Sequence, residues 1–363
     1  MVKIHVIIPV YNALKYLSAA VDSVLSQPCR DIDIVLVNDG STDGSDSLCD
    51  TLAAENSRIS VIHQKNAGVS SARNAGIDYV LRITPPDCYA NHYITFLDAD
   101  DLWFPSVIDT ETVRNFQSDV IGYSCYCANC SATRLRTLHI HLPSQLERPL
   151  GTVSWFGYGL MGSYFYRLPL FTRYGLRFPV GVKGNEDIIF LQKVGFCCQS
   201  VVYTKDFLYI YRMNPASYTH TAKYLPENAD HVPFAWLHEA DWAYSLSSFS
   251  SEQCAAWKSF CIKMAGARIL EASRGLAESC IPYRTYKAFL RDASHCQLFG
   301  FLCESFLSDW QKADYQLFRS SPLLFYCKCR FRGTLSRILK QLLRIKKIRH
   351  LREQKSYPIT FDL

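Results

Sequence analysis

The sequence predicts an α/β fold with a mostly parallel central sheet, followed by a mainly helical C-terminal region. Short apolar runs alternate with segments of helical periodicity over the first hundred residues. Polar clusters stand directly after several of those runs. After about residue 226 the apolar residues recur only at helical spacing. Alternation of strands and helices implies a parallel sheet with helices on both faces, so the first part of the chain is expected to form one.

Buried strands are expected where short runs rich in Ile, Val and Leu occur, because such runs suit strands covered on both faces. These runs are 4–8, 32–37, 59–63 and 93–97, and the composition of 200–213 is also strand-like. Helices are expected between them, at about 14–25, 43–55 and 70–81. The turn-rich segment Thr84–Asn91 is interpreted as an inserted loop.

The length of 363 residues favours about two domains. We expect a sheet domain over 1–225, a helical region over 226–330 and a basic tail over 331–363. Hydrophobic residues make up 48% and charged residues 20%, which excludes a disordered chain. There is no run of about 20 apolar residues, and the first residues do not form a secretory signal, so a cytoplasmic location is predicted. The net charge of +6 is modest, and no nucleic-acid partner is expected.

The fifteen cysteines are interpreted mainly as small, reduced core residues, as expected in the cytosol. The spacing of Cys125, Cys127 and Cys130 leaves a structural zinc site as an alternative. No His or Cys pair stands at a familiar distance downstream, which favours buried thiols on a strand.

Three polar clusters follow predicted strands, at Pro9–Asn12, Asn38–Asp43 and Asp98–Asp101. In open α/β sheets, ligands bind at the carboxyl ends of the strands. The three clusters are therefore expected to outline one binding site.

The carboxylates of Asp98, Asp100 and Asp101 would repel one another if they were ionised side by side. A divalent cation, Mg²⁺ or Mn²⁺, would relieve this repulsion and could also hold a diphosphate. The alternative is an acidic turn that caps a helix beginning near Trp103.

For each of the other charged residues, two interpretations remain open. Asp39 could accept a hydrogen bond from a nucleobase, or could belong to a turn and helix cap. Lys65 and Arg73 could neutralise a diphosphate, or could be solvated basic residues. Glu186 and Asp187 could be acids favoured in the first turn of a helix, or one of them could be a general base.

Taken in order and at these spacings, the motifs over about residues 4–220 resemble glycosyltransferase family 2. The matching segments are Pro9–Ala13, Val37–Asp43, Asn66–Asn74, Phe96–Asp101, Gly175–Phe178, Glu186-Asp187, and Tyr211-Arg212 followed by Ser217. The resemblance implies a GT-A fold and a nucleoside diphosphate sugar as donor, usually a UDP-sugar. The carboxylate pair Glu186-Asp187 would then supply the base, with Asp187 preferred and Glu186 as the alternative.

The resemblance also implies which residues hold the donor and the metal. They are Pro9 and Tyr11 at the nucleoside, Asp39 at the base, Asp98 at the ribose, Arg73 at the diphosphate and Asp100 at Mn²⁺ or Mg²⁺. His220 is either a late metal or phosphate ligand or polar loop surface.

The expected reaction is a single displacement at the anomeric carbon, which inverts its configuration. Processive relatives carry a Gln-x-x-Arg-Trp motif, whereas Tyr211-Arg212-Met213 stands in that region here. This difference favours the transfer of one sugar, a hexose or an N-acetylhexosamine. By analogy, the acceptor is expected to be a lipid-linked oligosaccharide of a bacterial surface polysaccharide, such as O-antigen, capsule or exopolysaccharide.

Two other functions remain as alternatives. A nucleotidyltransferase that makes a nucleotide sugar should carry a Gly-rich loop with a basic residue after the first strand, and Pro9-Val-Tyr-Asn stands there instead. A non-catalytic scaffold of a polysaccharide assembly complex would not need intact Asp98, Asp100 and Asp187.

The tail predicts an amphipathic, basic helix. Its apolar stripe is Leu335, Ile338, Leu339, Leu342 and Leu343, and its basic face is Arg337, Lys340, Arg344 and Lys347. No Asp or Glu occurs between Gly333 and Arg352. Such a helix favours peripheral binding to the cytoplasmic face of the inner membrane. Packing on the protein's own C-terminal region is the alternative, and the apolar stripe argues against a nucleic-acid arm.

Overall fold

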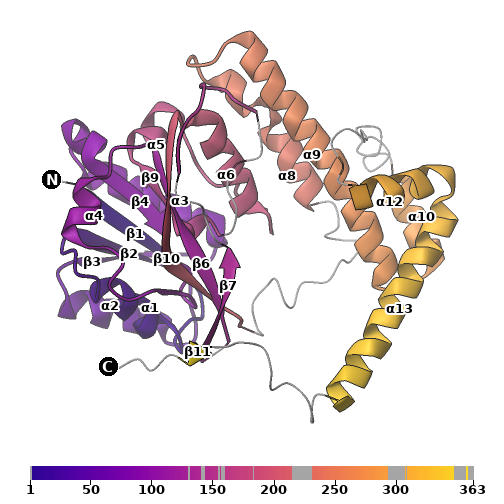
Figure 1. The fold of residues 1–363 in the computed structure, drawn as a ribbon, viewed down its shortest axis with the longest axis horizontal. Coiled ribbons are helices and arrows are strands. Elements are labelled where there is room, and N and C mark those ends of the chain that lie inside the picture. The colour runs from indigo at the N-terminus through magenta and orange to yellow at the C-terminus, as the bar shows by residue number, and fades with distance from the viewer. Residues whose placement is uncertain are drawn as a thin grey trace. The chain divides into compact units, whose positions relative to one another are not determined.

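The computed structural model describes residues 2–129, 131–139, 144–153, 156, 160–182, 184–214, 231–292, 307, 309–346 and 357–358. The chain divides into two compact units. The first holds the sheet and comprises Met1–Gly181, Asn185–Ser217 and Ser356–Leu363. The second comprises Val182–Gly184 and Tyr218–Lys355, and its described elements are helices (Figure 1).

The centre of the first unit is a four-stranded parallel sheet in the order β3-β2-β1-β4. Its strands are β1 (Lys3–Val10), β2 (Ile32–Asp39), β3 (Ile59–Gln64) and β4 (His92–Phe96). The connecting helices are α1 (Leu17–Leu25), α2 (Ser45–Glu55) and α3 (Val69–Ile83). This alternation confirms the predicted α/β class and its parallel central sheet.

Further strands extend the sheet beyond β4. The path continues through β9 (Tyr164–Arg167), β6 (Val120–Ala128), β7 (Arg134–His139) and β11 (Tyr357–Pro358), with antiparallel pairing at each step. β10 (Ser200–Arg212) pairs in parallel with β6 and antiparallel with β5 (Leu102–Trp103) and β8 (Ser144–Glu147). Because β9 is antiparallel to both β4 and β6, the strands β1–β4, β6 and β10 all run in the same direction.

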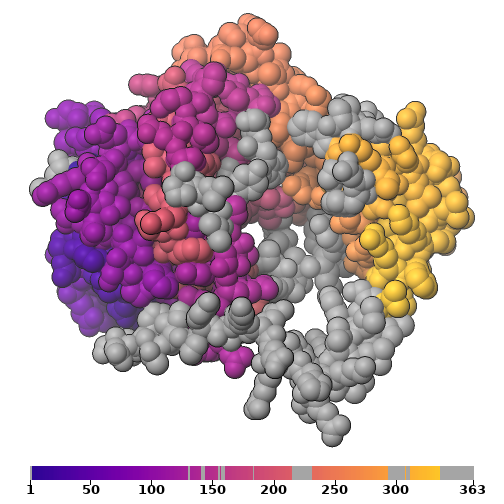
Figure 2. Space-filling view, in the orientation of Figure 1, coloured from indigo at the N-terminus to yellow at the C-terminus, as the bar shows by residue number. Residues whose placement is uncertain are grey.

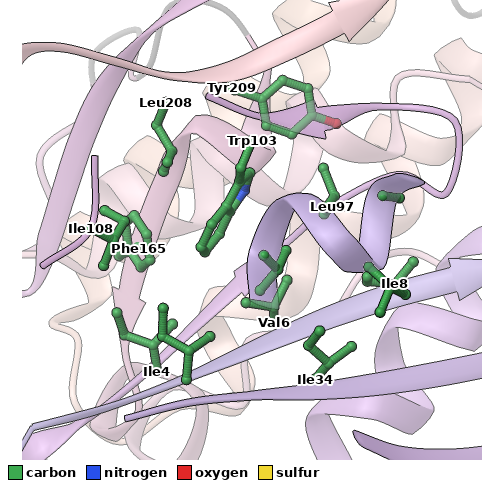
Figure 3. Packing of buried hydrophobic residues seen from close by; sticks show 14 of the residues in the cluster. Ile4, Val6, Ile8, Ile34, Leu97, Trp103, Ile108, Phe165, Leu208 and Tyr209 are labelled. Atoms are coloured by element: carbon green, nitrogen blue, oxygen red, sulfur yellow. The ribbon is translucent and has the colours of Figure 1, made fainter. Parts of the chain in front are cut away.

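One layer of the core lies against β1 and is built from its alternate residues. Ile4, Val6 and Ile8 are fully buried there in one cluster with Trp103 and Phe165 (Figure 3). Each such side chain contributes about 1.5–3 kcal/mol when it is removed from water. On α3, a Cβ at Gly76 would lie 2.5 Å from the Ile7 side chain, so glycine lets this helix approach the sheet closely.

The helix considered near Trp103 is not formed, and this alternative was wrong. Leu102 and Trp103 form β5, which pairs with Ile210 and Tyr209 of β10. The Phe104 N–H donates to the Leu208 carbonyl at 2.6 Å, and the Trp103 N–H donates to Ser23 Oγ at 3.0 Å. Both backbone N–H groups therefore bond to other elements. A helix over these residues would have excluded the pairing of β5 with β10.

The remaining elements of the first unit are short, apart from α6. They are α4 (Thr110–Arg114), α5 (Pro169–Arg173), α6 (Glu186–Cys197), and the 3₁₀ turns η1 (Pro86–Asn91) and η2 (Met161–Ser163). η1 occupies most of the segment interpreted as an inserted loop.

The described part of the second unit is helical, as predicted for the C-terminal region. It contains α8 (His231–His238), η3 (Glu239–Ser245), α9 (Ser251–Glu278), α10 (Tyr283–Arg291), α12 (Asp309–Ser320) and α13 (Pro322–Lys346). A capping box formed by Ser250 and Gln253 begins α9. Helix α13 packs against α9 and α12, and the yellow atoms of α12 and α13 lie beside the orange of α9 in Figure 2. None of the described helices is both long and apolar enough to span a membrane.

The cysteines in the described part of the chain form no disulfide. Cys125 and Cys127 are buried on β6. Cys197 and Cys198, at the end of α6, are also buried. Cys329 is buried and Cys327 is exposed, while Cys130 lies outside the described residues. The described residues also contain no group of three or more His, Cys, Asp or Glu side chains that could hold a metal ion.

Candidate active site

Three neighbouring strands end at the same edge of the sheet, and each brings one predicted site residue there. The register pairs Pro9 of β1 with Val37 of β2, and Ile7 with Phe96 of β4. Asp39 at the end of β2 and Asp98 after β4 therefore lie on the two sides of the end of β1. The structure thus brings the polar clusters predicted at the strand ends together at one edge.

Asp39 is buried and both of its carboxylate oxygens are occupied. It accepts hydrogen bonds from Gln64 Nε2 at 2.7 Å, from the Ala67 N–H at 2.8 Å and from the Gly68 N–H at 2.9 Å. These bonds fix the loop between β3 and α3, on which Lys65 is exposed. Gly40 follows with φ +70°, and a Cβ there would lie 2.8 Å from the Asn66 nitrogen. Asp39 thus shapes this side of the site through the loop.

The loop after β1 is tied to the loop after β2. Asn12 Oδ1 accepts from the Thr42 N–H at 2.8 Å, and the Leu14 N–H donates to Asp43 Oδ2 at 3.1 Å. Asp43 Oδ1 also accepts from the Ser45 N–H, the first residue of α2. Tyr11 stands on this rim with 54% of its surface exposed, so its ring is available for stacking.

Arg73 of α3 is buried and links two elements of the site. Its Nη2 lies 2.8 Å from Asp98 Oδ1, its Nη1 lies 3.1 Å from Glu186 Oε1, and its guanidinium lies 5.2 Å from the Phe178 ring centroid. Burial opposes the guanidinium charge, but the two carboxylates outweigh it and raise the pKa of Arg73. In this arrangement Arg73 is directed at two carboxylates, whereas the sequence predicted that it faces a diphosphate.

The acidic turn after β4 is anchored to β10. Asp101 is buried and accepts from the Tyr209 hydroxyl at 2.6 Å and from the Arg212 N–H at 2.7 Å. The Asp98 N–H in turn donates to Tyr209 Oη at 3.4 Å. Burial raises the pKa of Asp101, and the neighbouring carboxylates of Asp98 and Asp100 add to the rise. The pairing of β5 with β10 thus places the turn that carries Asp98 and Asp100.

Asp100 is half-buried and accepts from Asn214 Nδ2 at 3.0 Å. Burial raises the pKa of Asp100; the bond from Asn214 opposes the rise, and the nearby charge of Asp98 adds to it. A desolvated carboxylate next to another carboxylate gains from a cation, so Asp100 is suited to bind one.

Glu186 and Asp187 occupy the first turn of α6, after Asn185 in the left-handed conformation (φ 63°). Burial and the Glu186 charge raise the pKa of Asp187 to about 6, although Arg73 opposes the rise. The Oδ1 of Asp187 accepts from the Ile188 N–H at 2.8 Å. Glu186 is held by Arg73, so Asp187 is the carboxylate better placed to take up a proton.

Several partners were missing from the sequence prediction. Phe178, Tyr209 and Asn214 contact predicted site residues, but each is more than a hundred residues away from its partner in the chain. Of these, only Phe178 stood inside a recognised motif. The predicted residue His220 lies outside the described residues, as does Ser217.

Residues 5–170 match the profile of Glycosyl transferase family 2. The chain carries a family 2 glycosyltransferase domain. It is 33% identical over 229 residues to glycosyltransferase GlyA of Streptococcus pneumoniae, a match that covers 59% of this chain and 31% of GlyA. It is 31% identical over 241 residues to the uncharacterized glycosyltransferase EpsJ of Bacillus subtilis, covering 63% of this chain and 66% of EpsJ. The chain thus spans under two thirds of the length of these relatives.

The fold of the glycosyltransferase domain and the helical region also resembles a solved structure. S. aureus TarS 1–349, crystallised with UDP-GlcNAc, superposes with a TM-score of 0.62 at 16% identity, covering 92% of each chain. The likeness confirms the expected GT-A fold with a helical C-terminal region.

Proposed function

We propose that the protein transfers a single sugar from a UDP-sugar to an acceptor hydroxyl and inverts the anomeric configuration. The observation that carries the proposal is Asp187, whose pKa is raised to about 6 beside the strand-end carboxylates. A base of this pKa is ionised at neutral pH and can still accept a proton in the transition state. The family 2 domain supports the reaction class.

The residues around Asp187 divide the work. The Arg73 guanidinium compensates the Glu186 carboxylate and holds it at 3.1 Å, which leaves Asp187 to take the proton of the acceptor hydroxyl. The acceptor oxygen then forms its bond to the anomeric carbon as the bond to the diphosphate oxygen breaks, in a single displacement. Arg73 also fixes Asp98, the proposed ribose contact, at 2.8 Å.

Asp100 is the proposed protein ligand for Mn²⁺ or Mg²⁺. Its carboxylate oxygens suit these hard cations, and burial together with the nearby Asp98 charge raises its pKa, so a cation would stabilise its ionised form. A bound divalent cation would stabilise the charge that develops on the departing diphosphate. His220 is a proposed additional ligand, and the exposed Lys65 is a proposed diphosphate contact.

Pro9, Tyr11 and Asp39 are the proposed nucleoside contacts. Tyr11 offers an exposed ring at the rim. Asp39 accepts three hydrogen bonds from Gln64 and the β3–α3 loop, and a base would donate a further one to its carboxylate. The choice of a UDP-sugar is supported by the UDP-GlcNAc held by TarS, whose fold this chain shares.

The proposed acceptor is a lipid-linked oligosaccharide in the synthesis of a bacterial surface polysaccharide. We place the protein in the cytoplasm, at the inner face of the membrane. The carboxyl half of α13 supports this placement, because its sequence combines an apolar stripe with Arg337, Lys340 and Arg344.

Product analysis with UDP-sugars and Mn²⁺ tests the proposed reaction. A transferase releases UDP slowly without acceptor and faster with it, a nucleotidyltransferase releases pyrophosphate, and a scaffold releases neither.

Asp100→Ala is expected to abolish transfer and metal-dependent UDP binding, because it removes the proposed metal ligand. The exposed Asp87→Ala on η1 is the control and should keep full activity. Near-normal turnover of Asp100→Ala, or turnover unchanged by EDTA, would contradict the metal assignment.

A further inference from the structure

A cavity of about 330 Å³ opens between three helices of the second unit. It is lined by Arg274 of α9, Ala313 and Asp314 of α12, and Lys328 and Arg332 of α13. Three cationic side chains and one carboxylate therefore line the cavity. None of these residues belongs to a motif of the glycosyltransferase domain.

The single carboxylate is already engaged by two of the cations. Asp314 is buried, and its Oδ1 lies 2.9 Å from Lys328 Nζ, while its Oδ2 lies 3.8 Å from Arg274 Nη1. Arg274 also has Glu278 Oε1 at 3.8 Å from its Nε. These contacts hold Lys328 and Arg274 in place at the wall of the cavity.

Arg332 is the cation without such a contact. Its side chain is exposed, and within the part of the chain that the structure describes it forms no ion pair with a carboxylate. It stands one helical turn after Lys328, so both project from the same side of α13. A guanidinium presents a fork of N–H donors that matches the oxygens of a phosphate group. The cavity is thus suited to a phosphate, with Arg332 as its open donor.

The surface beside these cations is apolar. Leu324, Phe331 and Leu335 are 59%, 70% and 44% exposed, and their spacing places them on one stripe of α13. At 100° per residue, Lys328 and Arg332 both lie along one edge of this stripe. An apolar helix face bordered by cations matches the boundary between phosphate headgroups and acyl chains.

We propose that this cavity binds the phosphate of an anionic phospholipid headgroup, with the stripe Leu324, Phe331 and Leu335 lying at the acyl boundary. The proposal rests on the membrane placement made above and names the group that is recognised there. It adds a specific contact to the general attraction of a basic helix.

The test uses the full chain and two vesicle types of equal surface charge. One type carries phosphatidic acid, which has an exposed phosphate, and the other type carries phosphatidylserine. The wild-type protein is expected to bind the phosphatidic acid vesicles at least about tenfold more tightly. Arg332→Gln should lose that preference. Arg319→Gln, an exposed arginine of α12 that does not line the cavity, should keep it.

The outcomes separate this inference from the proposals on which it rests. If the wild-type protein, Arg332→Gln and Arg319→Gln all show the same vesicle preference, or none of them shows any, with salt-dependent affinity, the membrane placement stands and the phosphate site is wrong. Competition by millimolar inorganic phosphate against wild type, without any vesicle preference, would make it a site for free phosphate and overturn the lipid proposal. Transfer to a water-soluble acceptor should be unchanged in both variants, so a loss of transfer would not be mistaken for a loss of lipid binding.

Discussion

Two adjacent carboxylates, Glu186 and Asp187, have opposite surroundings. The Arg73 guanidinium forms an ion pair with Glu186, whereas burial and the Glu186 charge raise the pKa of Asp187 to about 6. Neighbouring carboxylates in such different surroundings commonly take different roles in a site. The local charges thus favour Asp187 as the proton acceptor.

Asp187→Asn should keep donor affinity and lose turnover by at least about a hundredfold, the usual scale for a general base. Glu186→Gln is the matched comparison and should retain more activity. Turnover and donor binding are measured by single-turnover kinetics and calorimetry. An inactive Glu186→Gln with an active Asp187→Asn would exchange the two roles.

The same carboxylate predicts a pH dependence of both activity and stability. Transfer should decline as the pH falls below about 6, because Asp187 becomes protonated. The folded pKa is above the unfolded value, so the folded state holds the extra proton between about pH 4 and 6, and stability falls as the pH rises through that window. Asp187→Asn should therefore raise the Tm at neutral pH. The corresponding gain in unfolding free energy is no more than about 3 kcal/mol. A lower Tm for this variant at pH 7, or a pH profile identical to that of wild type in the remaining activity, would contradict the assigned pKa.

Residues of the site that stand at strand ends could be predicted from the sequence, because a strand end is visible as the end of an apolar run. The sequence placed Asp39, Asp98 and Asp100 at strand ends in this way, and the structure has them at or just after the ends of β2 and β4. Their partners could not be found. Nothing in the local sequence indicates that Arg73 meets Glu186 across 113 positions, since that contact depends on how α3 and α6 pack.

At the scale of elements, β10 holds the acidic turn through its pairing with β5 and through the Tyr209 hydroxyl. Tyr209 joins the turn at two points, through Asp101 Oδ2 and through the Asp98 N–H. A Cβ at Gly162 would lie 2.3 Å from the Tyr209 ring and 2.4 Å from the Phe96 carbonyl, so this glycine lets the ring reach the end of β4. The geometry of the site therefore depends on the packing of η2, β4 and β10.

Tyr209→Phe should lower transfer by about tenfold or more and cost about 1–2 kcal/mol of stability, because Asp101 loses a buried donor. Tyr93→Phe is the matched control, since Tyr93 is also fully buried and its hydroxyl donates to the Ser118 carbonyl at 2.8 Å. Both variants should melt earlier in calorimetry, and only Tyr209→Phe should lose activity beyond what its melting explains. Equal activity in the two would show that Tyr209 only stabilises the fold.

The sequence predicted the elements whose pattern is local. β1 to β4 are continuous apolar runs and were identified within a few residues of their bounds. The alternative of a helix start at β5 was wrong, because its two residues pair with β10, which lies a hundred residues later in the chain. β7 alternates buried Leu135 with exposed Arg134 and Arg136, and β9 is only four residues long, so neither gave a signal like that of the central strands.

For the whole molecule, α13 connects the two regions that the sequence had separated. The helix runs from Pro322 to Lys346 and passes through the boundary predicted between 330 and 331. A Cβ at Gly333 would lie 2.2 Å from the Glu278 carbonyl, so α13 is pressed against the end of α9 at this position. A truncation after Cys329 would remove this contact, and a loss of stability would then be confused with a loss of membrane binding.

Substitution of charge alone avoids that confusion and gives the sharpest test of the membrane placement. Replacing Arg337, Lys340, Arg344 and Lys347 by Gln removes four positive charges and leaves Gly333 and the apolar stripe unchanged. Each cation near an anionic surface contributes about 1 kcal/mol, so affinity for anionic vesicles should fall several hundredfold. Sedimentation with vesicles at low and high salt measures this change.

The control changes the net charge by the same amount elsewhere in the second unit. Arg284, Lys287 and Arg291 of α10 and Arg319 of α12 are exposed and can be replaced by Gln together. If general charge attracts the protein to the membrane, both quadruple variants should lose affinity equally; if the tail lies on the membrane, only the first should lose it. Transfer to a water-soluble acceptor should survive in both, because none of these residues belongs to the proposed active site. A tail variant that aggregates or melts much earlier, together with a wild-type protein that ignores anionic vesicles, would instead make the end of α13 a packing element of the protein itself.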